Sequence, residues 1–512
     1  MRYHLLPSIA LLIVVSSLRG QEKPTEEIWE SVFARDRQGR DQQIGYTRLS
    51  FETLTVNGKI IIRGTRQLRI NFKRDGQLAE LKGDTGTEEN EDGKVVGISM
   101  RQWLGKNQTL AMSGQPDKTG KFIEYTVEGS SDDKPRKNAW DPRVIGLSGE
   151  RNILRDKKAA PGDSFSYRYY EPTLSIVVTI QIQVKDLKEV LLPRGGKKIL
   201  LCVELLPQKI LDVQLPPSMI WVDPKSYEQV LSQTDMFGLG LGMLTFQRSS
   251  KALALGPLGD VPDLMKMQTL QVNPGVSDPH SLHGIVYEIT VQGKDVDFAK
   301  LIKEDDRQTI KNKTEKSFEL QVLARRSPLA LEKVDPPGEE FLESNYYINS
   351  ADEKVRKLAE LAVGKLTDPW AKARAIERWV RANMKSVNYT EAMATSDHVA
   401  KTLSGDCSEF SMLAAAMCKA QRIPARTALG LVYVEGKAAH SLVFHMWTEV
   451  YIQGQWLGLD ATRGQGYIGP GHIKITDHSW HKTEGFNPLL PVTGFMMAKP
   501  TIKVLSATTD KD

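Results

Sequence analysis

The chain has 512 residues, and its apolar fraction of 40% and charged fraction of 26% are those of ordinary globular proteins. This composition excludes a disordered tail protein, a collagen-like fibre and a polytopic membrane protein, and the length predicts roughly two to four domains. The net charge of +5, from 68 basic and 63 acidic side chains, gives no support for nucleic acid as the main partner.

Residues 1–20 have the pattern of a secretory signal peptide. Arg2 and His4 precede an apolar run from Leu5 to Val15, and small residues follow at Ser16 and Ser17. The run is shorter than the roughly twenty residues that cross a bilayer. We therefore expect a secreted or periplasmic protein with no stable membrane span in its mature chain; an uncleaved anchor is the alternative.

The three cysteines are too few for a disulfide framework. Export with so little cysteine favours a bacterial periplasm or exterior. Cys202 lies in an apolar run and is predicted to be a small buried residue.

Residues 21–326 are predicted to form an antiparallel, β-rich region of one or two domains. Apolar and polar residues alternate at 68–73 and at 178–185, as in half-buried strands. Asn57-Gly58 between two apolar runs predicts a tight hairpin. His280 and His283 lie in this region, but two histidines are too few for a metal site.

Residues 327–344 are rich in proline and predict a linker, and residues 345–500 predict an α+β domain. Ser350 to Glu353 reads as a capping box, and Asp368-Pro369 as the cap and first position of a second helix. A third helix is expected after Gly405-Asp406, followed by strands at 427–434, 442–452 and 456–460.

Cys407 falls at the start of that third helix. The positive end of a helix dipole favours a thiolate, which is the form that a cysteine nucleophile needs. If one helix holds both Cys407 and Cys418, they lie roughly 16 Å apart, too far for a disulfide.

His445 and Asp460 are predicted to meet on one face of a hairpin. If the loop between the two strands has two residues, Gln453-Gly454 or Gly454-Gln455, both side chains point to the same side. A loop of three residues would place them on opposite faces. On one face, His445 would take a proton from Cys407 and return it to a leaving amine, and Asp460 would fix the imidazole tautomer.

These segments resemble the transglutaminase-like superfamily, whose papain-like fold sets a helix that bears a cysteine against a sheet that bears a histidine and an aspartate. The similarity lies in Gly405-Asp-Cys407, the Arg422-Ile-Pro stretch, His445-Met-Trp447 and Asp460-Ala-Thr462, within residues 345 to 480. The resemblance implies that Cys407, His445 and Asp460 are a catalytic triad.

The resulting hypothesis is a thiol enzyme that acts on amide or peptide bonds of a protein or peptide substrate, without metal or cofactor. Its thioester would be resolved by water, as in a protease or amidase, or by a primary amine, as in a transglutaminase; for an exported bacterial protein we favour water. The backbone N–H of Cys407 is a natural oxyanion donor, with Asn388 or Tyr389 as a candidate second donor.

Three alternatives stay open at this point. The domain can be a catalytically silent binding or envelope-interaction module, because fold does not fix function. His440 is a competing histidine, five residues before His445. His472, His478 and His481 are a candidate metal-binding group, although no cysteines accompany them.

Overall fold

The computed structural model describes residues 26–36, 38–104, 108–128, 135–210, 213–236, 241–264, 269–292, 302–329, 335–384, 386–387, 393–436, 439–481 and 487–510. The predicted signal peptide at residues 1–20 lies outside these ranges. In the described residues, no helix combines the length and the hydropathy needed to cross a bilayer.

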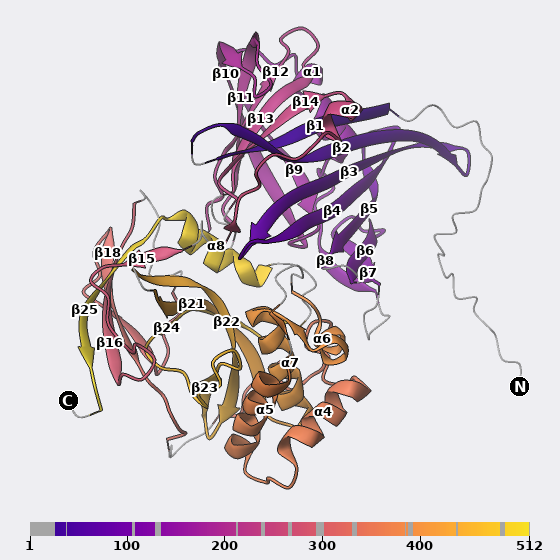
Figure 1. The fold of residues 1–512 in the computed structure, drawn as a ribbon. Helices are drawn as coiled ribbons and strands as arrows, with labels where there is room; N and C mark the ends of the chain where they lie inside the picture. The colour runs from indigo at the N-terminus through magenta and orange to yellow at the C-terminus, as the bar shows by residue number, and fades with distance from the viewer. Residues whose placement is uncertain are drawn as a thin grey trace, which may run out of the picture.

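An antiparallel sheet of 14 strands makes up the first half of the chain and forms the upper body in Figure 1. Its order is β8-β7-β6-β5-β4-β3-β2-β1-β14-β13-β12-β11-β10-β9, so strands that are neighbours in sequence pair, and β1 closes on β14. The antiparallel β-rich region predicted from the sequence is confirmed. The strands are β1 (Glu26–Arg35), β2 (Asp41–Val56), β3 (Lys59–Arg74), β4 (Gln77–Asn90), β5 (Val95–Trp103), β6 (Thr109–Pro116), β7 (Phe122–Val127), β8 (Arg136–Ala139), β9 (Ser164–Glu171), β10 (Ile176–Leu191), β11 (Lys197–Pro207), β12 (Ser218–Val222), β13 (Gln229–Asp235) and β14 (Met243–Ser249).

Turn chemistry sets the register of the long hairpins. Val56 pairs with Lys59, which leaves Asn57 and Gly58 as a two-residue turn with φ values of 50° and 76°. Asparagine and glycine tolerate this left-handed backbone best, so the predicted hairpin forms where the sequence places it. Cys202 is buried in β11, also as predicted.

The first sheet curls until its two ends approach each other. Val144, which follows β8, bridges to Arg168 in β9, and Asn138 donates to the carbonyl of Ser175 at 3.1 Å. Helix α1 (Leu147–Asp156) packs against β3 and β4, and the buried Glu89 carboxylate accepts two N–H groups of its first turn at 2.8 and 3.0 Å. This carboxylate therefore caps α1 from the sheet.

A second sheet, with nine strands, carries the other half of the molecule. Its order is β17-β18-β16-β25-β15-β22-β21-β24, with β23 paired to β22; β15 and β25 run parallel and the other pairs antiparallel. Strands β15 to β18 precede the proline-rich segment in sequence and yet belong to this sheet. The strands are β15 (Leu270–Val272), β16 (Gly284–Thr290), β17 (Gln308–Lys311), β18 (Ser317–Leu323), β21 (Ala425–Glu435), β22 (His440–Ile452), β23 (Gln455–Leu459), β24 (His472–His478) and β25 (Thr501–Thr508).

A group of helices packs beside β22, at the bottom of Figure 1. Helix α7 lies at its centre, is almost wholly buried and contacts α4, α5, α6 and β22. This combination of helices and sheet confirms the predicted α+β class of the second half. The remaining elements are α2 (Lys251–Ala254), η3 (Glu339–Phe341), α4 (Glu353–Val363), α5 (Pro369–Asn383), β19 (Ser386–Val387), α6 (Ser396–Thr402), β20 (Ser404–Gly405), α7 (Cys407–Ala420), η4 (Asn487–Leu489) and α8 (Leu490–Met497).

Two of the predicted helix starts are confirmed and one is displaced. Asp368 caps α5 with Pro369 at the first position, and Asp406 caps α7. The capping box predicted from Ser350 is wrong, because α4 begins two residues later than that pattern requires. Asp352 is its cap and accepts the N–H groups of Lys354 and Val355. An aspartate closer to the helix is as good an acceptor as the serine.

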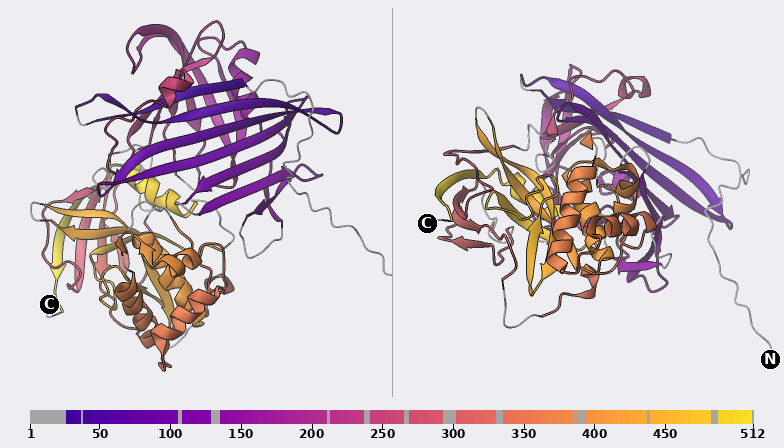
Figure 2. Two further views of the ribbon diagram at one scale, coloured as in Figure 1. Left: turned by 45° about the vertical axis from the view of Figure 1, so that its right-hand side comes forward. Right: turned by 60° about the horizontal axis from the view of Figure 1, so that its bottom comes forward.

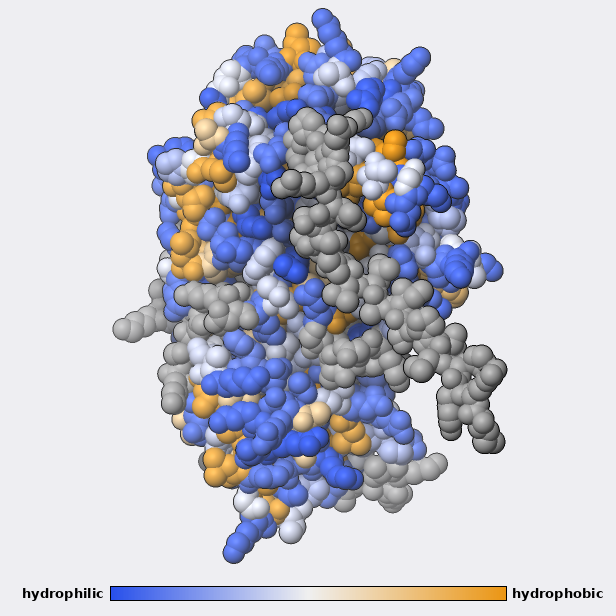
Figure 3. Space-filling model, turned by 90° about the vertical axis from the view of Figure 1, so that its right-hand side faces the viewer, coloured by the Kyte–Doolittle hydropathy of each residue, from blue (hydrophilic) through white to orange (hydrophobic). Residues whose placement is uncertain are grey.

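The two halves share a core. Apolar residues of β5 to β7, and Trp140 after β8, belong to the same buried cluster as those of α4, α5, α7 and the second sheet. Helix α8 lies between the halves in Figures 1 and 2, and its Leu490 packs into the cluster under β9 to β12. Gln108 also bonds to the hydroxyl and the N–H of Thr395, at 2.6 and 3.1 Å. The face shown in Figure 3 mixes polar residues with scattered apolar groups across both halves.

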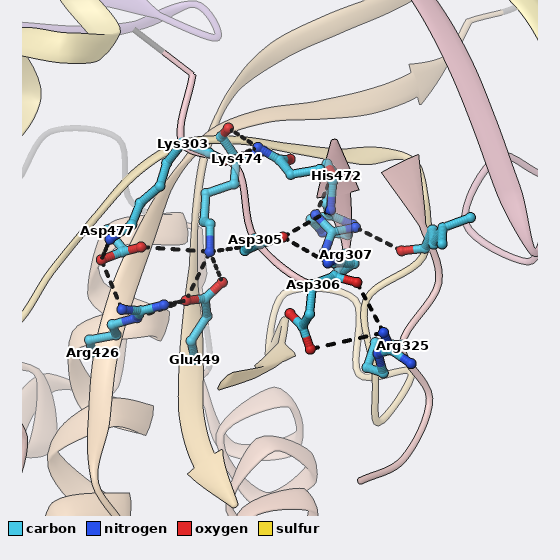
Figure 4. A network of polar contacts seen from close by, with 12 residues as sticks. Lys303, Asp305, Asp306, Arg307, Arg325, Arg426, Glu449, His472, Lys474 and Asp477 are labelled. Carbon is cyan, nitrogen blue, oxygen red and sulfur yellow. Dashed lines mark hydrogen bonds and ion pairs between the residues drawn. The ribbon is translucent and has the colours of Figure 1, made fainter. Parts of the chain in front are cut away.

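A buried charge network ties β17 and its preceding loop to the centre of the second sheet (Figure 4). The side chain of Lys474 is 1% exposed and pairs with Asp305 and with Glu449, the latter at 3.1 Å. Arg426 pairs with Glu449 at 2.7 Å and with Asp477 at 2.9 Å. Buried charges are tolerated when they are paired in this way.

We expect Lys474→Met to destabilise the protein by about 3–5 kcal/mol, because it leaves buried carboxylates without a partner. Lys503→Met is the matched control: it removes an ion pair with Glu288 whose side chains are 58% and 34% exposed, and should cost about 0–1 kcal/mol. Urea unfolding of the full chain, followed by tryptophan fluorescence, measures both. Equal stability of the two variants would contradict this role of the network.

Candidate active site

Cys407 is the first residue of helix α7, where the sequence placed it. Asp406 accepts the N–H of Ser408 at 3.0 Å, and Glu409 accepts the N–H of Asp406 at 2.9 Å, which completes a capping box. The cysteine is partly exposed, whereas the helix residues from Ser408 to Lys419 are buried. The thiol therefore lies at the positive end of a helix and remains accessible to reagents.

The glycine before this cap has a physical reason. Gly405 has a φ of 147°, and a Cβ there would lie 2.3 Å from the Cβ of Glu409. Any other residue would push Glu409 out of the capping box. The Gly-Asp-Cys sequence is thus what lets the helix begin at this cysteine.

The β22–β23 hairpin brings His445 and Asp460 to one face. Ile452 pairs with Gln455 across a two-residue turn, Gln453-Gly454, and Thr448 pairs with Leu459. If this register is extended by one more residue pair beyond Thr448 and Leu459, Asp460 lies opposite Trp447 and diagonal to His445. Nε2 of His445 lies 2.9 Å from Oδ2 of Asp460. The two-residue loop is therefore the correct alternative, and the contact between the two side chains is present.

Contacts between α7 and β22 hold the cysteine near this histidine. The hydroxyl of Thr448 donates to the carbonyl of Ser411 at 3.1 Å, and the hydroxyl of Ser411 donates to the carbonyl of Cys407 at 2.7 Å. Cys407 lies close enough to His445 to contribute to the raised pKa of its imidazole. Since Nε2 of His445 is used by Asp460, Nδ1 is the ring nitrogen left for the thiol.

Electrostatics favours a charged imidazole. Burial alone lowers the pKa of His445, but the charges of Asp460 and Cys407 and the hydrogen bond to Asp460 outweigh it and raise the pKa to about 10. Burial alone raises the pKa of Asp460, and the charge and hydrogen bond of His445, with the contact to His472, hold it well below its usual range. At neutral pH, Asp460 is ionised and His445 carries a proton.

Asp460 has further partners that fix its orientation. It is 1% exposed, and its Oδ1 accepts the N–H and the hydroxyl of Thr462 at 2.9 and 2.6 Å. The loop that follows is held from α5: Arg381 donates to the carbonyl of Thr462, and Glu377 accepts the N–H of Gly466 at 3.1 Å. Burial raises the pKa of Glu377 to about 7.

His472 is a residue of this site that the sequence reading did not place here. Its Nε2 lies 3.0 Å from Oδ2 of Asp460, the oxygen that His445 also contacts, and its side chain is fully buried. Burial lowers the pKa of His472 to about 3, so the ring is neutral and its Nε2–H donates to the carboxylate. Its position on β24 depends on Gly430, where a Cβ would lie 2.0 Å from the carbonyl oxygen of Ile473.

The other histidines named from the sequence have different partners. His440 lies five positions before His445 on the same strand and therefore points to the opposite face. Nδ1 of His478 accepts the N–H of Trp480, and His481 pairs with Glu343. His472, His478 and His481 thus do not converge on one point. Asn388 and Tyr389, the candidate oxyanion donors, lie outside the described residues.

A different trio has the chemistry for a metal ion. Among the described residues, His445, Asp460 and His472 offer one ligand atom each, all within 4.8 Å of one another. Two imidazoles and a carboxylate suit zinc. However, both Nε2 atoms lie at hydrogen-bonding distance from one carboxylate oxygen, and this bonding accounts for the cluster without an ion.

Comparison with known proteins identifies part of the chain. The sequence model of the transglutaminase-like superfamily matches residues 356–461, from α4 to the residue after Asp460. The chain therefore contains a transglutaminase-like domain, and the resemblance seen in the sequence is confirmed. No curated protein matches the chain.

Several solved structures are distantly similar. A candidate cysteine protease from Cytophaga hutchinsonii is 22% identical, with 41% of this chain and 78% of that chain covered and a TM-score of 0.27. A beta-barrel-like protein with a domain of unknown function, from Brucella abortus, is 10% identical, with 44% and 96% covered and a TM-score of 0.32. The periplasmic domain of TgpA from Pseudomonas aeruginosa, bound to ethylmercury, is 17% identical, with 38% and 83% covered and a TM-score of 0.24.

We expect His472 to make the protein sensitive to acid. Its folded-state pKa of about 3 lies below the unfolded value of about 6.5, so between these values the unfolded chain binds the extra proton. The free energy of unfolding therefore falls as pH drops from about 6.5 toward 3, by up to about 1.4 kcal/mol per pH unit for this one group. His472→Gln, which keeps an N–H donor and cannot titrate, should flatten that slope.

Denaturant unfolding at several pH values between about 4.5 and 6.5 measures the effect, and above this range the difference between variant and wild type should become constant. His283→Gln is a suitable control, because the side chain of His283 is 54% exposed. An equal acid slope in His472→Gln and wild type would contradict a buried, neutral His472.

Proposed function

We propose that this protein is an exported thiol enzyme that acts on amide or peptide bonds, with Cys407 as nucleophile, His445 as general acid and base, and Asp460 as the residue that orients His445. The observation that carries the proposal is the placement of one buried imidazole between the carboxylate of Asp460 and the thiol at a helix start. Export rests on the signal-like pattern of residues 1–20.

The first half of the proposed reaction forms a thioester. The thiolate of Cys407 attacks the carbonyl carbon of the substrate amide, and the carbonyl oxygen becomes an oxyanion. The protonated Nδ1 of His445 then gives its proton to the leaving nitrogen, the C–N bond breaks, and the amine departs. The backbone N–H of Cys407, at the first position of α7, has no acceptor within the helix and is available to the oxyanion.

The second half releases the acyl group. His445 takes a proton from water as the water oxygen attacks the thioester carbon, the C–S bond breaks, and a carboxylic acid leaves while the thiolate of Cys407 and the protonated imidazole of His445 are restored. We favour water over an amine acceptor, so the proposed activity is that of a protease or amidase on a protein or peptide substrate. A primary amine in place of water would give a transglutaminase reaction with the same residues.

The reactivity of the thiol tests this proposal without knowledge of the substrate. In a chain with Cys202 and Cys418 replaced by alanine, iodoacetamide can label Cys407 alone. We expect fast labelling near pH 7, and labelling about tenfold or more slower in His445→Ala, because the thiolate loses its counter-ion. His440→Ala, on the same strand and the opposite face, is the control and should label like the parent.

Labelling that begins only near pH 8.5, where an ordinary cysteine ionises, would contradict an assembled triad and favour a silent binding module. If labelling behaves as expected, a peptide library with and without a primary amine separates hydrolysis from transamidation. Cys407→Ala should then reduce the turnover by about 10³-fold or more.

A further inference from the structure

The end of the β3–β4 hairpin reaches from the first sheet to the start of helix α7. Nη2 of Arg74, the last residue of β3, lies 2.7 Å from Oδ2 of Asp406, the cap of that helix. The side chains are only 20% and 3% exposed. Arg74, from the first half of the molecule, therefore contacts the residue that directly precedes the proposed nucleophile.

The backbone holds this hairpin end in place. Arg74 pairs with Gln77 across a two-residue turn, Asp75-Gly76. The N–H of Lys73 donates to the carbonyl of Pro262 at 2.7 Å, and the N–H of Gly76 donates to Asp263 at 3.2 Å. Because the N–H groups of Lys73 and Gly76 are hydrogen-bonded on both sides of Arg74, the fold fixes the backbone from which this side chain reaches Asp406.

Arg74 contacts Asp406, one of the two buried acids Asp406 and Glu409 on either side of the cysteine. Asp406 accepts the N–H and the hydroxyl of Ser408, at 3.0 and 2.6 Å, and Glu409 accepts the N–H of Ala394 at 2.9 Å. Burial and the neighbouring Asp406 raise the pKa of Glu409 well above its usual range, which favours the protonated form of this side chain. Burial opposes ionisation of Asp406, but Arg74 and Ser408 outweigh it and lower the pKa.

An ionised carboxylate next to Cys407 works against a thiolate, because like charges at short distance disfavour each other. The guanidinium of Arg74 cancels that charge and is itself stabilised by Asp406 and by Cys407, although burial opposes its charge. The same ion pair holds the carboxylate in its capping position, so that the first turn of α7 stays formed at the thiol.

We propose that Arg74 is a positioning residue of the Cys407 site: it keeps Asp406 in place as the cap of α7 and neutralises it beside the thiolate. The active site is thus completed by the first sheet and is not contained in the transglutaminase-like domain alone. This inference rests on the proposed function for its meaning, but its test does not require amide turnover.

The test is the pH profile of Cys407 alkylation by iodoacetamide in the full chain, again without Cys202 and Cys418. We expect Arg74→Gln to label about tenfold more slowly at pH 7, with the midpoint about one pH unit higher, because an unpaired carboxylate then faces the thiolate. Arg74→Lys should recover most of the rate. Arg63→Gln is the matched control, since Arg63 is on the same strand in an exposed ion pair with Glu88.

The double variant Arg74→Gln with Asp406→Asn separates charge from packing. Asparagine still caps the helix, so removal of the carboxylate should return the midpoint toward that of the parent. A double variant as slow as Arg74→Gln alone would overturn the electrostatic role, and so would an Arg74→Gln profile identical to that of the parent.

If Arg74→Gln does not fold, the single variant Asp406→Asn tests the inference, because it keeps both the helix cap and the guanidinium. We expect the midpoint of its alkylation profile to lie at a lower pH than that of the parent. An unchanged or higher midpoint would overturn the inference. The His445→Ala profile is recorded in the same series. A thiol that responds to Arg74 and not to His445 would refute the triad and leave the role of Arg74 standing, and the converse would refute Arg74 alone.

Discussion

The carboxylate of Asp460 is the constraint around which the site is arranged. An ionised carboxylate taken out of water needs a full set of donors, and this one receives hydrogen bonds from the N–H and hydroxyl of Thr462, from His445 and from His472. These donors come from β22, β24 and the loop after β23. Because a slip of one residue turns a side chain to the other face, the carboxylate can be satisfied only if all three segments keep their register. The sheet around it is therefore specified by one buried charge as much as by its apolar core.

The same requirement recurs at two other buried acids and explains how distant parts of the chain are joined. Glu449 is compensated by Arg426 and by Lys474, and Lys474 in turn reaches Asp305 in the loop before β17. Asp406 is compensated by Arg74 of the first sheet. The pairs Arg74–Asp406 and Lys474–Asp305 join segments that are remote in sequence. Loss of a partner from a buried pair costs more than the pair contributes when intact, so these contacts penalise any arrangement in which the segments are apart.

The features that could be predicted from the sequence are those that depend only on residues close together in the chain. The Asn57-Gly58 turn, the caps of α5 and α7, and the parity that brings His445 to Asp460 are set by residues within one or two elements, and each is present. The assignment of β15 to β18 to the second sheet is not local, because alternation shows that a strand is half-buried and not which sheet it joins. Arg74 and His472 could not be assigned to the site from the sequence, for a related reason. An arginine at the end of a hairpin is ordinarily solvated, and nothing near Arg74 in sequence points to Asp406. The sequence groups His472 with the nearby His478 and His481, whereas its partner in the structure is Asp460, which follows a different strand.

The charge balance at Cys407 shows why neither half of the molecule explains the site alone. Two bases, His445 and Arg74, face two ionised acids, Asp460 and Asp406, while burial and Asp406 raise the pKa of Glu409 and favour its protonated form. These charges cancel in pairs, so the field of the α7 terminus is left to act on the thiol. Without Arg74, the groups beside the sulfur carry a net charge of one negative unit. The helix terminus is equivalent to about half a positive charge and cannot offset it. A domain cut to the residues that match the superfamily would keep Cys407, His445 and Asp460 and would lose this compensation. In the proposed site, the residues named by the motif therefore depend on a charge that the first sheet supplies.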